Sequence, residues 1–481
     1  MAAQARRAGG IGVIDLGGAA WTDGEPDREA LASIEAALAW STGPIAVRVS
    51  RDCPLAVDEL ERVAAGRVDL VILTMDARWP MAATASRYRV LAEVTSPAEA
   101  ADAARAGAHG LIARGAESGG RVSELGTYVL LQQILAASAG LPVWAAGGIG
   151  LRTAAASVLG GAAGVVLDSQ LGLLPESDLP GEICRPLRRM DGGAATDREA
   201  PSPAPTGDRP DEPPAIGQDG WLAATFLTRF GDTAGAVRAI RKSIVDAVAV
   251  PPLTLAPGAA LATDLGIRIP VAQGPMTRVS DQAAFAAAVA ADGALPFIAL
   301  ALADGERSRL MLDDTAVALA GRPWGVGVLG FVPDALRAEQ IVAIRASRPH
   351  YAIIAGGRPA QAAELERDGI PTFLHVPSPG LLEQFLRAGS RRFVFEGAEC
   401  GGHIGPRASF VLWEAQLAVL GDFLDGQPAE VCAEIQIFFA GGVHDSRSAA
   451  MVAALAAPLT ARGVRIGVLM GTAYLFTEEA V

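Results

Sequence analysis

Four short motifs in the second half of the chain combine glycines with residues that could bind an anion or move a proton. They are Gln273-Gly274-Pro275-Met276, Glu399-Cys400-Gly401-Gly402-His403, Ala440-Gly441-Gly442 and Met470-Gly471-Thr472. Glycine has no Cβ, so backbone N–H groups at such turns can approach phosphate oxygens closely, and helix N-termini add a favourable dipole. Either of the last two turns alone is explained equally well as a tight turn. Together they favour a phosphate site.

His403 is the residue best suited to proton transfer. An imidazole can take or give a proton near neutral pH, and His403 follows two glycines at the end of an apolar run. We interpret His109, His350 and His375 as structural, and His444 as a residue that caps the following helix. Cys400 lies beside the glycines, but no nearby base is evident, so we expect its thiol to pack behind the loop.

The elements that position these motifs alternate between short apolar runs and Ala-rich helical segments. We expect strands near 269–273, 296–301, 324–330, 351–355, 371–375, 392–396, 435–440 and 465–470. Eight such units predict a closed TIM-type (β/α)8 barrel, with a doubly wound open sheet as the main alternative. In a barrel the carboxyl ends of the strands form the reactive face, and phosphate sites commonly follow strands 7 and 8. All four motifs fall at such strand ends.

The first half shows the same alternation with fewer units. We expect strands at 11–16, 45–49, 69–73, 89–93, 110–113, 142–146 and 164–168. Seven strands in about 185 residues are few for a complete barrel. This half is therefore predicted to be a trimmed or degenerate barrel of α/β class.

An internal repeat links the two halves. Residues 115–120 (GAESGG) match 397–402 (GAECGG), 144–150 resemble 438–444, and 165–177 align with 467–479. Three matches in one order indicate duplication of one barrel type.

The first copy differs from the second at the residues suited to chemistry. Arg121 stands at the position of His403, and arginine stays protonated in proteins, which makes it a poor base. Asp168 and Ser169 align with Met470 and Gly471, and a carboxylate aimed at a phosphate would repel it. We expect the first half to have lost the chemistry, and the cofactor with it.

The segment 192–218 is rich in Pro, Gly and acidic residues and reads as a flexible linker. We expect a first domain at 1–191 and a second at 219–481. The chain ends where a helix covering the last strand should begin, which suggests a longer polypeptide.

Composition excludes several classes of protein. The 481 residues are 51% hydrophobic, and 40 basic against 53 acidic residues give 40 − 53 = −13, so nucleic-acid binding is not expected. The four cysteines form no CxxC pair, and no metal-ligand cluster stands out. No signal peptide or transmembrane segment is evident, so we expect a cytoplasmic protein with no membrane partner.

The motifs QGPM, ECGGHIGP, AGG and MGT, in this order, resemble the nitronate monooxygenase (2-nitropropane dioxygenase) family, which includes flavin-dependent enoyl-acyl-carrier-protein reductases of fatty acid and polyketide synthases. The resemblance covers most of 260–481, and the first half is a weaker, degenerate copy. It implies a TIM barrel with FMN at its mouth and His403 as the acid/base. The implied cofactor contacts are Gly274, Pro275 and Met276 at the flavin ring, Gly441, Gly442, Gly471 and Thr472 at the phosphate, and Gly327, Gly401, Gly402 and Ala440 elsewhere. Relatives often carry Asn where the third strand here has Gly327.

The resemblance leaves the direction of electron flow open. His403 could remove an α-proton from a nitroalkane, or protonate the substrate during reduction of an enoyl thioester by flavin that NAD(P)H has reduced. Tandem halves, a long linker and the abrupt end suggest the N-terminal part of a megasynthase, with an acyl carrier protein and other synthase domains as partners. The non-enzymatic alternative is an inactive docking or scaffold pair.

Overall fold

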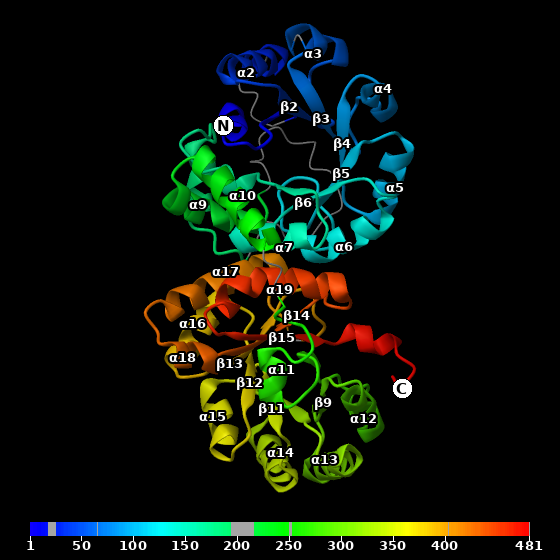
Figure 1. The fold of residues 1–481 in the computed structure, drawn as a ribbon, viewed down its shortest axis with the longest axis vertical. Coiled ribbons are helices and arrows are strands. Elements are labelled where there is room, and N and C mark those ends of the chain that lie inside the picture. The colour runs from blue at the N-terminus through cyan, green and yellow to red at the C-terminus, as the bar shows by residue number, and fades with distance from the viewer. Residues whose placement is uncertain (18–25, 65, 194–215, 250–252, 403, 481) are drawn as a thin grey trace. The chain divides into compact units, whose positions relative to one another are not determined.

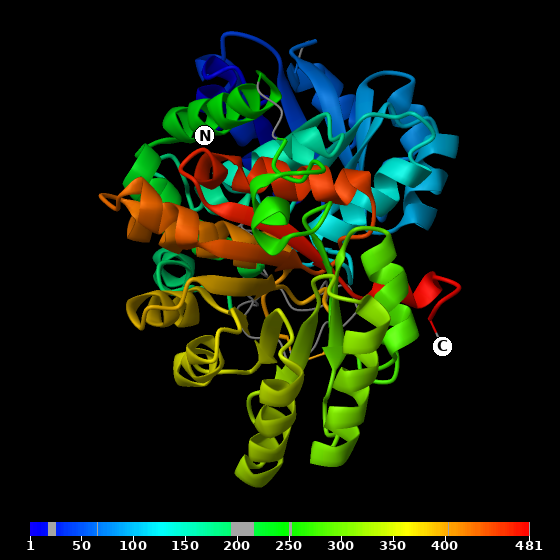
Figure 2. The same ribbon diagram turned by 60° about the horizontal axis from the view of Figure 1, so that its bottom comes forward.

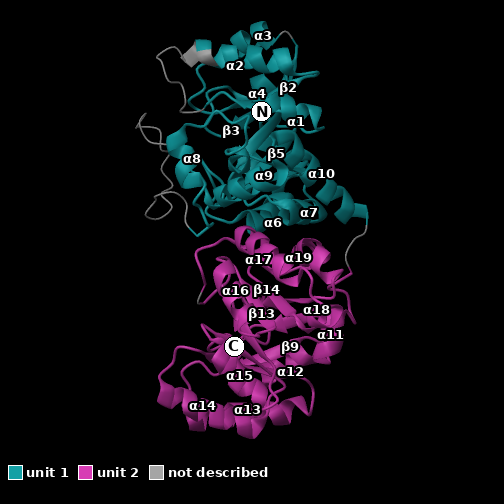
Figure 3. Cartoon of the chain, turned by 90° about the vertical axis from the view of Figure 1, so that its left-hand side faces the viewer, with its two compact units in different colours: residues 1–249 teal, residues 250–481 magenta. Residues whose placement is uncertain are grey.

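The computed structural model describes residues 1–17, 26–64, 66–193, 216–249, 253–402 and 404–480. The chain divides into two compact units, Met1–Ala249 (unit 1) and Val250–Val481 (unit 2) (Figure 3). Most of the expected linker, 194–215, lies outside the described residues.

The boundary between the units differs from the expected one at residue 219. Helices α9 (Leu222–Phe230) and α10 (Thr233–Ala249) belong to unit 1. Their buried residues, Phe226 and Ile240 among them, pack into unit 1, where α10 lies against α7 (Leu151–Leu159). The Ser243 hydroxyl also donates a hydrogen bond to the Leu151 carbonyl over 2.5 Å. Burial of these apolar faces assigns the segment to unit 1.

Unit 2 is a closed barrel of eight parallel strands, which confirms the expected (β/α)8 fold (Figures 1 and 2). The strands are β8 (Val271–Gln273), β9 (Leu295–Ala299), β10 (Gly325–Leu329), β11 (Tyr351–Ala355), β12 (Thr372–His375), β13 (Arg392–Glu396), β14 (Gln436–Ala440) and β15 (Arg465–Met470). Closure occurs where Met470 of β15 pairs with Gln273 of β8. The carboxyl ends of all eight strands therefore meet at one mouth.

Helices lie around the outside of this barrel (Figure 2), and apolar side chains pack in its interior. The helices are α11 (Ala260–Leu265), α12 (Ala283–Ala291), α13 (Gly305–Leu319), α14 (Asp334–Ser347), α15 (Pro359–Arg367), α16 (Pro379–Arg387), α17 (Ser409–Leu424), α18 (Ala429–Glu434) and α19 (Ser446–Thr460), and a 3₁₀ turn, η3 (Thr472–Phe476), follows β15. One buried cluster joins Phe297, Ile353, Phe373, Val394 and Phe438 from five strands. Because strand side chains alternate between faces, residues two positions beyond these also face inward.

Unit 1 contains seven parallel strands that pair in chain order, as expected for a trimmed barrel (Figure 1). They are β1 (Val13–Asp15), β2 (Ile45–Val49), β3 (Val68–Thr74), β4 (Arg89–Val94), β5 (Gly110–Arg114), β6 (Val143–Ala146) and β7 (Gly164–Val166). The other elements are α1 (Ala2–Arg7), α2 (Pro26–Trp40), α3 (Val57–Ala64), α4 (Met81–Ala85), α5 (Pro97–Arg105), α6 (Thr127–Ala137), α7, α8 (Gly181–Leu187), η1 (Ser169–Leu171), η2 (Gln218–Trp221), α9 and α10. No eighth strand joins this sheet within the described residues.

The repeat is visible in strand register. Arg114 pairs with Ala146 as Glu396 pairs with Ala440, so β5 and β6 correspond to β13 and β14. The glycines share one backbone conformation: φ is +115° and +65° at 147–148 and +112° and +68° at 441–442. Counting back from these strands, β1 corresponds to β9. The described residues of unit 1 therefore contain no counterpart of β8, the strand that carries the QGPM motif.

Strand register also corrects the alignment of the last strands by one residue. Trp144 pairs with Gly164 as Phe438 pairs with Gly467. Counting forward, Asp168 corresponds to Gly471, where Met470 had been expected, and Ser169 corresponds to Thr472. Asp168 and Gly471 each precede a 3₁₀ turn, which agrees with this register. The sequence alignment was shifted by one residue, although Gly164 and Gly467 begin the two runs at equivalent positions.

Candidate functional site

The turns after β8, β10 and β15 converge at the mouth of unit 2. The Gly274 N–H donates to the Met470 carbonyl over 2.8 Å. A Cβ placed on Gly327 would lie 2.3 Å from the Pro275 Cβ, and one placed on Gly471 would lie 3.7 Å from the Met276 Sδ. These sequence-predicted residues therefore lie together. Pro275 also explains why strand β10 has glycine at position 327, since no larger side chain fits against the proline ring.

The turns after β13 and β14 lie against each other in the same way. The Gly397 N–H donates to the Ala440 carbonyl over 3.3 Å, and a Cβ on Gly441 would lie 3.1 Å from the Cys400 Sγ. Cβ atoms placed on Gly401 or Gly402 would meet nothing within 4 Å among the described atoms. Strands β14 and β15 are neighbours, so the two glycine turns predicted to bind phosphate lie side by side.

Small side chains line the barrel interior just below this mouth. Two positions beyond the buried interior cluster, the inward-facing residues are Ala299, Gly327, Ala355, His375, Glu396 and Ala440. Four of these six are Gly or Ala. The residues at this level of unit 2 are therefore small, apart from one histidine and one glutamate.

His375 and Glu396 form a nearly buried pair, which was not predicted from the sequence. The His375 Nδ1 lies 2.8 Å from the Glu396 Oε2, and the two side chains are 11% and 8% exposed. The contact lacks hydrogen-bond alignment, and within the described part of the chain His375 Nε2 has no hydrogen-bond partner. His375 was interpreted as structural. The sequence offered one signal: His375 ends its strand two residues after Phe373, so both side chains face the barrel interior. The predicted acid/base, His403, lies outside the described residues.

Glu399 and Cys400 have structural environments. The Glu399 Oε2 accepts hydrogen bonds from the Ser409 N–H and hydroxyl, over 2.8 and 2.6 Å. In the first copy Glu117 accepts the Thr127 N–H in the same manner, over 2.8 Å. The repeated glutamate therefore anchors the start of the next helix. Burial raises the pKa of Glu399 and, with Glu396 nearby, the pKa of Cys400, so the thiol remains protonated and is a poor nucleophile.

The residues after the β14 turn serve the following helix. Asp445 caps α19, since its carboxylate accepts the Ser448 N–H over 2.8 Å. His444, expected to cap this helix, instead has its exposed ring 3.2 Å from the Gly442 carbonyl. Because the Asp445 carboxylate already accepts a hydrogen bond at the N-terminus of α19, a phosphate at this mouth would be bound by the glycine turns and not by the α19 dipole.

The corresponding level of unit 1 is filled by charged side chains. By strand register, Asp15, Arg48, Glu93 and Arg114 replace Ala299, Gly327, His375 and Glu396. Arg48 lies 2.9 Å from Asp15 and makes two hydrogen bonds to Glu93, over 2.9 and 2.8 Å.

Glu93 is the centre of this network, because Arg114 also contacts it, over 3.2 Å. Burial acts to raise the pKa of Glu93, but the guanidinium groups of Arg114 and Arg48 outweigh it and lower the pKa to about 2. The carboxylate therefore stays ionised, and the network occupies the level that small residues line in unit 2.

Asp168 and Arg121, which also differ from their counterparts in unit 2, form ion pairs within unit 1. Asp168 pairs with Arg114 over 2.6 Å, and Arg121, at the position of His403, pairs with Glu99. Each of these two side chains therefore has a partner of opposite charge within unit 1.

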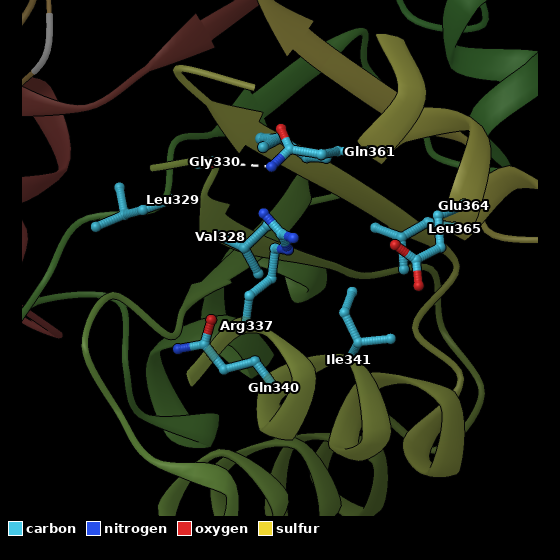
Figure 4. A pocket seen from close by; sticks show the side chains of 10 residues that line it. Val328, Leu329, Gly330, Arg337, Gln340, Ile341, Gln361, Glu364 and Leu365 are labelled. Atoms are coloured by element: carbon cyan, nitrogen blue, oxygen red, sulfur yellow. Dashed lines mark hydrogen bonds between the residues drawn. The ribbon is translucent and has the colours of Figure 1, made fainter. Parts of the chain in front are cut away.

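A separate small pocket lies between strands β10 and β11 and helices α14 and α15 (Figure 4). Val328 and Ile354 line it, and Gln361 Nε2 donates to the Gly330 carbonyl at its edge over 2.9 Å. These residues alternate with inward-facing ones, so the pocket belongs to the strand–helix layer and not to the mouth. Among the described residues, no group of His, Cys, Asp and Glu side chains could hold a metal ion. In the same ranges, no helix has the length and apolar character needed to cross a membrane.

Comparison with known proteins gives one family match and several fold-level similarities. The model of the family described as nitronate monooxygenase matches residues 2–181, in unit 1. No curated protein matches the chain. The chain is similar to the FabK structure from Thermotoga maritima (25% identity, TM-score 0.37) over 46% of this chain and 63% of FabK.

Two further structures show similarity of the same order. One is a nitroalkane oxidase from Streptomyces ansochromogenes, with 20% identity and a TM-score of 0.37 over 46% of this chain and 70% of that one. The other is the enoyl reductase domain of MlnA from Bacillus amyloliquefaciens, with 16% identity and a TM-score of 0.36 over 48% of this chain and 59% of that one. The chain spans less than two thirds of both FabK chains that it matches, 66% and 63%.

The family match confirms the resemblance to the nitronate monooxygenase family, but it falls on the first half, which was expected to be the weaker copy. Unit 1 therefore matches the nitronate monooxygenase family model over residues 2–181, which is less than half of the chain. Strand register and the shared glycine conformations relate unit 2 to it as a second copy.

Proposed function

We propose that this protein is an FMN-dependent oxidoreductase of the nitronate monooxygenase type whose cofactor and chemistry lie at the mouth of unit 2. The observation that carries the proposal is the contrast between the two copies at one level of the barrel. Unit 2 has Ala299 and Gly327 where unit 1 has Asp15 and Arg48. Unit 1 has a charged network at the same level, and its described residues contain no counterpart of β8.

The residues at the mouth of unit 2 fit the chemistry of FMN. The apolar Pro275 and Met276 offer a surface to an aromatic ring. Gly441, with φ at +112°, holds a turn that a larger residue would strain, and Gly471 lies beside Met276. Gly442 and Thr472 complete the proposed phosphate contacts. Gly274, Gly327, Gly401, Gly402 and Ala440 are proposed to border the cofactor.

FMN, when bound, would supply the redox chemistry, and the chain would supply position and a proton partner. His403 is proposed as the group that takes or gives that proton. His375, held beside Glu396 at the end of β12, lies on the same mouth. Its imidazole is proposed to orient a polar group of the substrate.

Unit 1 is proposed to bind no cofactor and to serve a structural or docking role. Its family-type fold is retained, but Arg48, Glu93 and Arg114 occupy the level that the ligand would need. The ion pairs that join them are internal and nearly buried.

The reaction is tested with purified protein. A yellow preparation containing FMN supports the enzyme, and a colourless preparation that cannot be reconstituted supports the inactive scaffold. Reduction by NAD(P)H followed by reoxidation with a crotonyl thioester would select enoyl reduction, with an acyl carrier protein as partner within a cytoplasmic synthase. Turnover of a nitroalkane with dioxygen would select nitronate oxidation.

A further inference from the structure

The glycine turn of unit 1 holds an acidic side chain from a distant part of the chain. Asp219, in η2, is 2% exposed. Its Oδ1 accepts the Ser169 hydroxyl over 2.6 Å, and its Oδ2 lies 3.4 Å from the Gln170 Nε2. The backbone N–H of Gly148 acts to lower the pKa of this carboxylate. Three donors from the turns after β6 and β7 thus converge on one anionic group.

Two of these three donors, Gly148 and Ser169, are the counterparts of residues proposed to hold the FMN phosphate in unit 2. By strand register, Gly148 corresponds to Gly442 and Ser169 to Thr472. The Asp219 carboxylate therefore occupies in unit 1 the place that a phosphate would take in unit 2.

The segment carrying Asp219 is fixed to the repeated GAES loop. The Asp219 N–H donates to the Glu117 carbonyl over 3.0 Å. A Cβ on Gly217 would lie 2.1 Å from the Glu117 oxygen and 2.2 Å from the Ser118 oxygen. Only glycine permits this approach, so the backbone of 217–219 is seated closely enough to deliver the carboxylate.

We propose that unit 1 retains a phosphate-type anion site that its own Asp219 carboxylate occupies, and that removing this carboxylate opens the site to a phosphate group. The existence of the anion site rests on the three donors, and the assignment of phosphate as its ligand class rests on the proposed function of unit 2. Asp219 thereby keeps a duplicated cofactor site closed.

Two charged groups stand near the site. Arg114 favours an anion there, and Asp168 opposes one, but these two are paired with each other over 2.6 Å. Burial raises the pKa of Asp219 to about 7, while the Ser169 hydrogen bond acts in the opposite direction. At pH 8 the native occupant is therefore an anion, and the test is made at that pH.

The test compares thermal unfolding of the full chain with and without inorganic phosphate at constant ionic strength. In Asp219→Ala, phosphate at about ten times its Kd should raise the unfolding temperature by about 3 °C more than in the wild type. Removing the hydroxyl as well, in Asp219→Ala/Ser169→Ala, should abolish this gain. The exposed Asp178→Ala is the matched control and should behave as the wild type.

A folded Asp219→Ala protein without extra stabilisation by phosphate would overturn the proposal. If the variant does not fold in chloride, its refolding yield in phosphate replaces the measurement, and equal yields in both salts would overturn it too. Because the readout is the difference from the wild type, it is independent of unit 2. FMN content of the wild type, measured separately, reports on the proposed function.

Discussion

Replacing Glu93 with glutamine should destabilise unit 1 strongly. Glu93 is 4% exposed and accepts hydrogen bonds from Arg48 and Arg114. The amide would leave two guanidinium groups of a nearly buried network without their shared counter-charge. Removing one partner of a buried pair typically costs about 3–5 kcal/mol. The lowered pKa of Glu93, about 2 instead of 4.5, independently corresponds to about 3 kcal/mol.

The assay is equilibrium unfolding of Glu93→Gln, with hydrogen exchange to assign the loss of protection to unit 1. We expect a loss of about 3 kcal/mol and a fall in unit 1 melting temperature of about 10 °C. The matched control is Asp69→Asn, whose exposed ion pair with Arg89 should contribute less than about 1 kcal/mol. Equal effects of the two variants would refute the account of the network.

The effect of Glu93 also has a defined pH dependence. A carboxylate whose pKa is lowered by folding stabilises the native state above the unfolded pKa, and the benefit is lost as the pH falls through the folded value. The wild type should therefore lose its advantage over Glu93→Gln between about pH 4.5 and pH 2. An advantage that persists at pH 2 would show that the glutamate acts through packing and not through its charge.

Three other substitutions test separate parts of the account. Because folding raises the pKa of Asp219 from 3.8 to about 7, the stability of the wild type relative to Asp219→Asn should fall between pH 4 and pH 7, by about 4 kcal/mol at most; unfolding at pH 5 and pH 8 measures it, and a flat difference contradicts it. His403→Ala should lower turnover by about 10²–10⁴ with FMN content unchanged, and an unchanged rate would make the residue structural. Gly327→Ala should lower both stability and FMN content, because its Cβ would lie 2.3 Å from Pro275, and an unaffected variant would mean that the proline moves freely.

Strand positions followed from the sequence because parallel barrel strands are short apolar runs bounded by turns. The runs at 45–49, 351–355, 392–396 and 465–470 match observed strands in full. The glycine turns at 441–442 and 471 could be placed for the same reason, since each ends such a run. Strand positions and glycine turns depend on neighbouring residues, so they can be predicted from short stretches of sequence.

The features that sequence alone did not predict depend on distant contacts. The helix 233–249 was assigned to unit 2 because only its packing against α7 shows otherwise. Asp219 lies beside a Pro- and acid-rich stretch and reads as a solvated residue until the Ser169 hydroxyl is seen to contact it. His375 needed strand pairing to place its ring beside Glu396.

The central claim is that only the second copy holds the cofactor, and flavin content per full-length chain tests it most directly. The account predicts one FMN per chain in the wild type, loss of FMN in Gly441→Ala, and retention of one FMN in Gly147→Ala. The two glycines share φ values of +112° and +115°, so the substitutions are matched in backbone strain. Two FMN per chain, or loss of FMN in Gly147→Ala with Gly441→Ala unaffected, would contradict it.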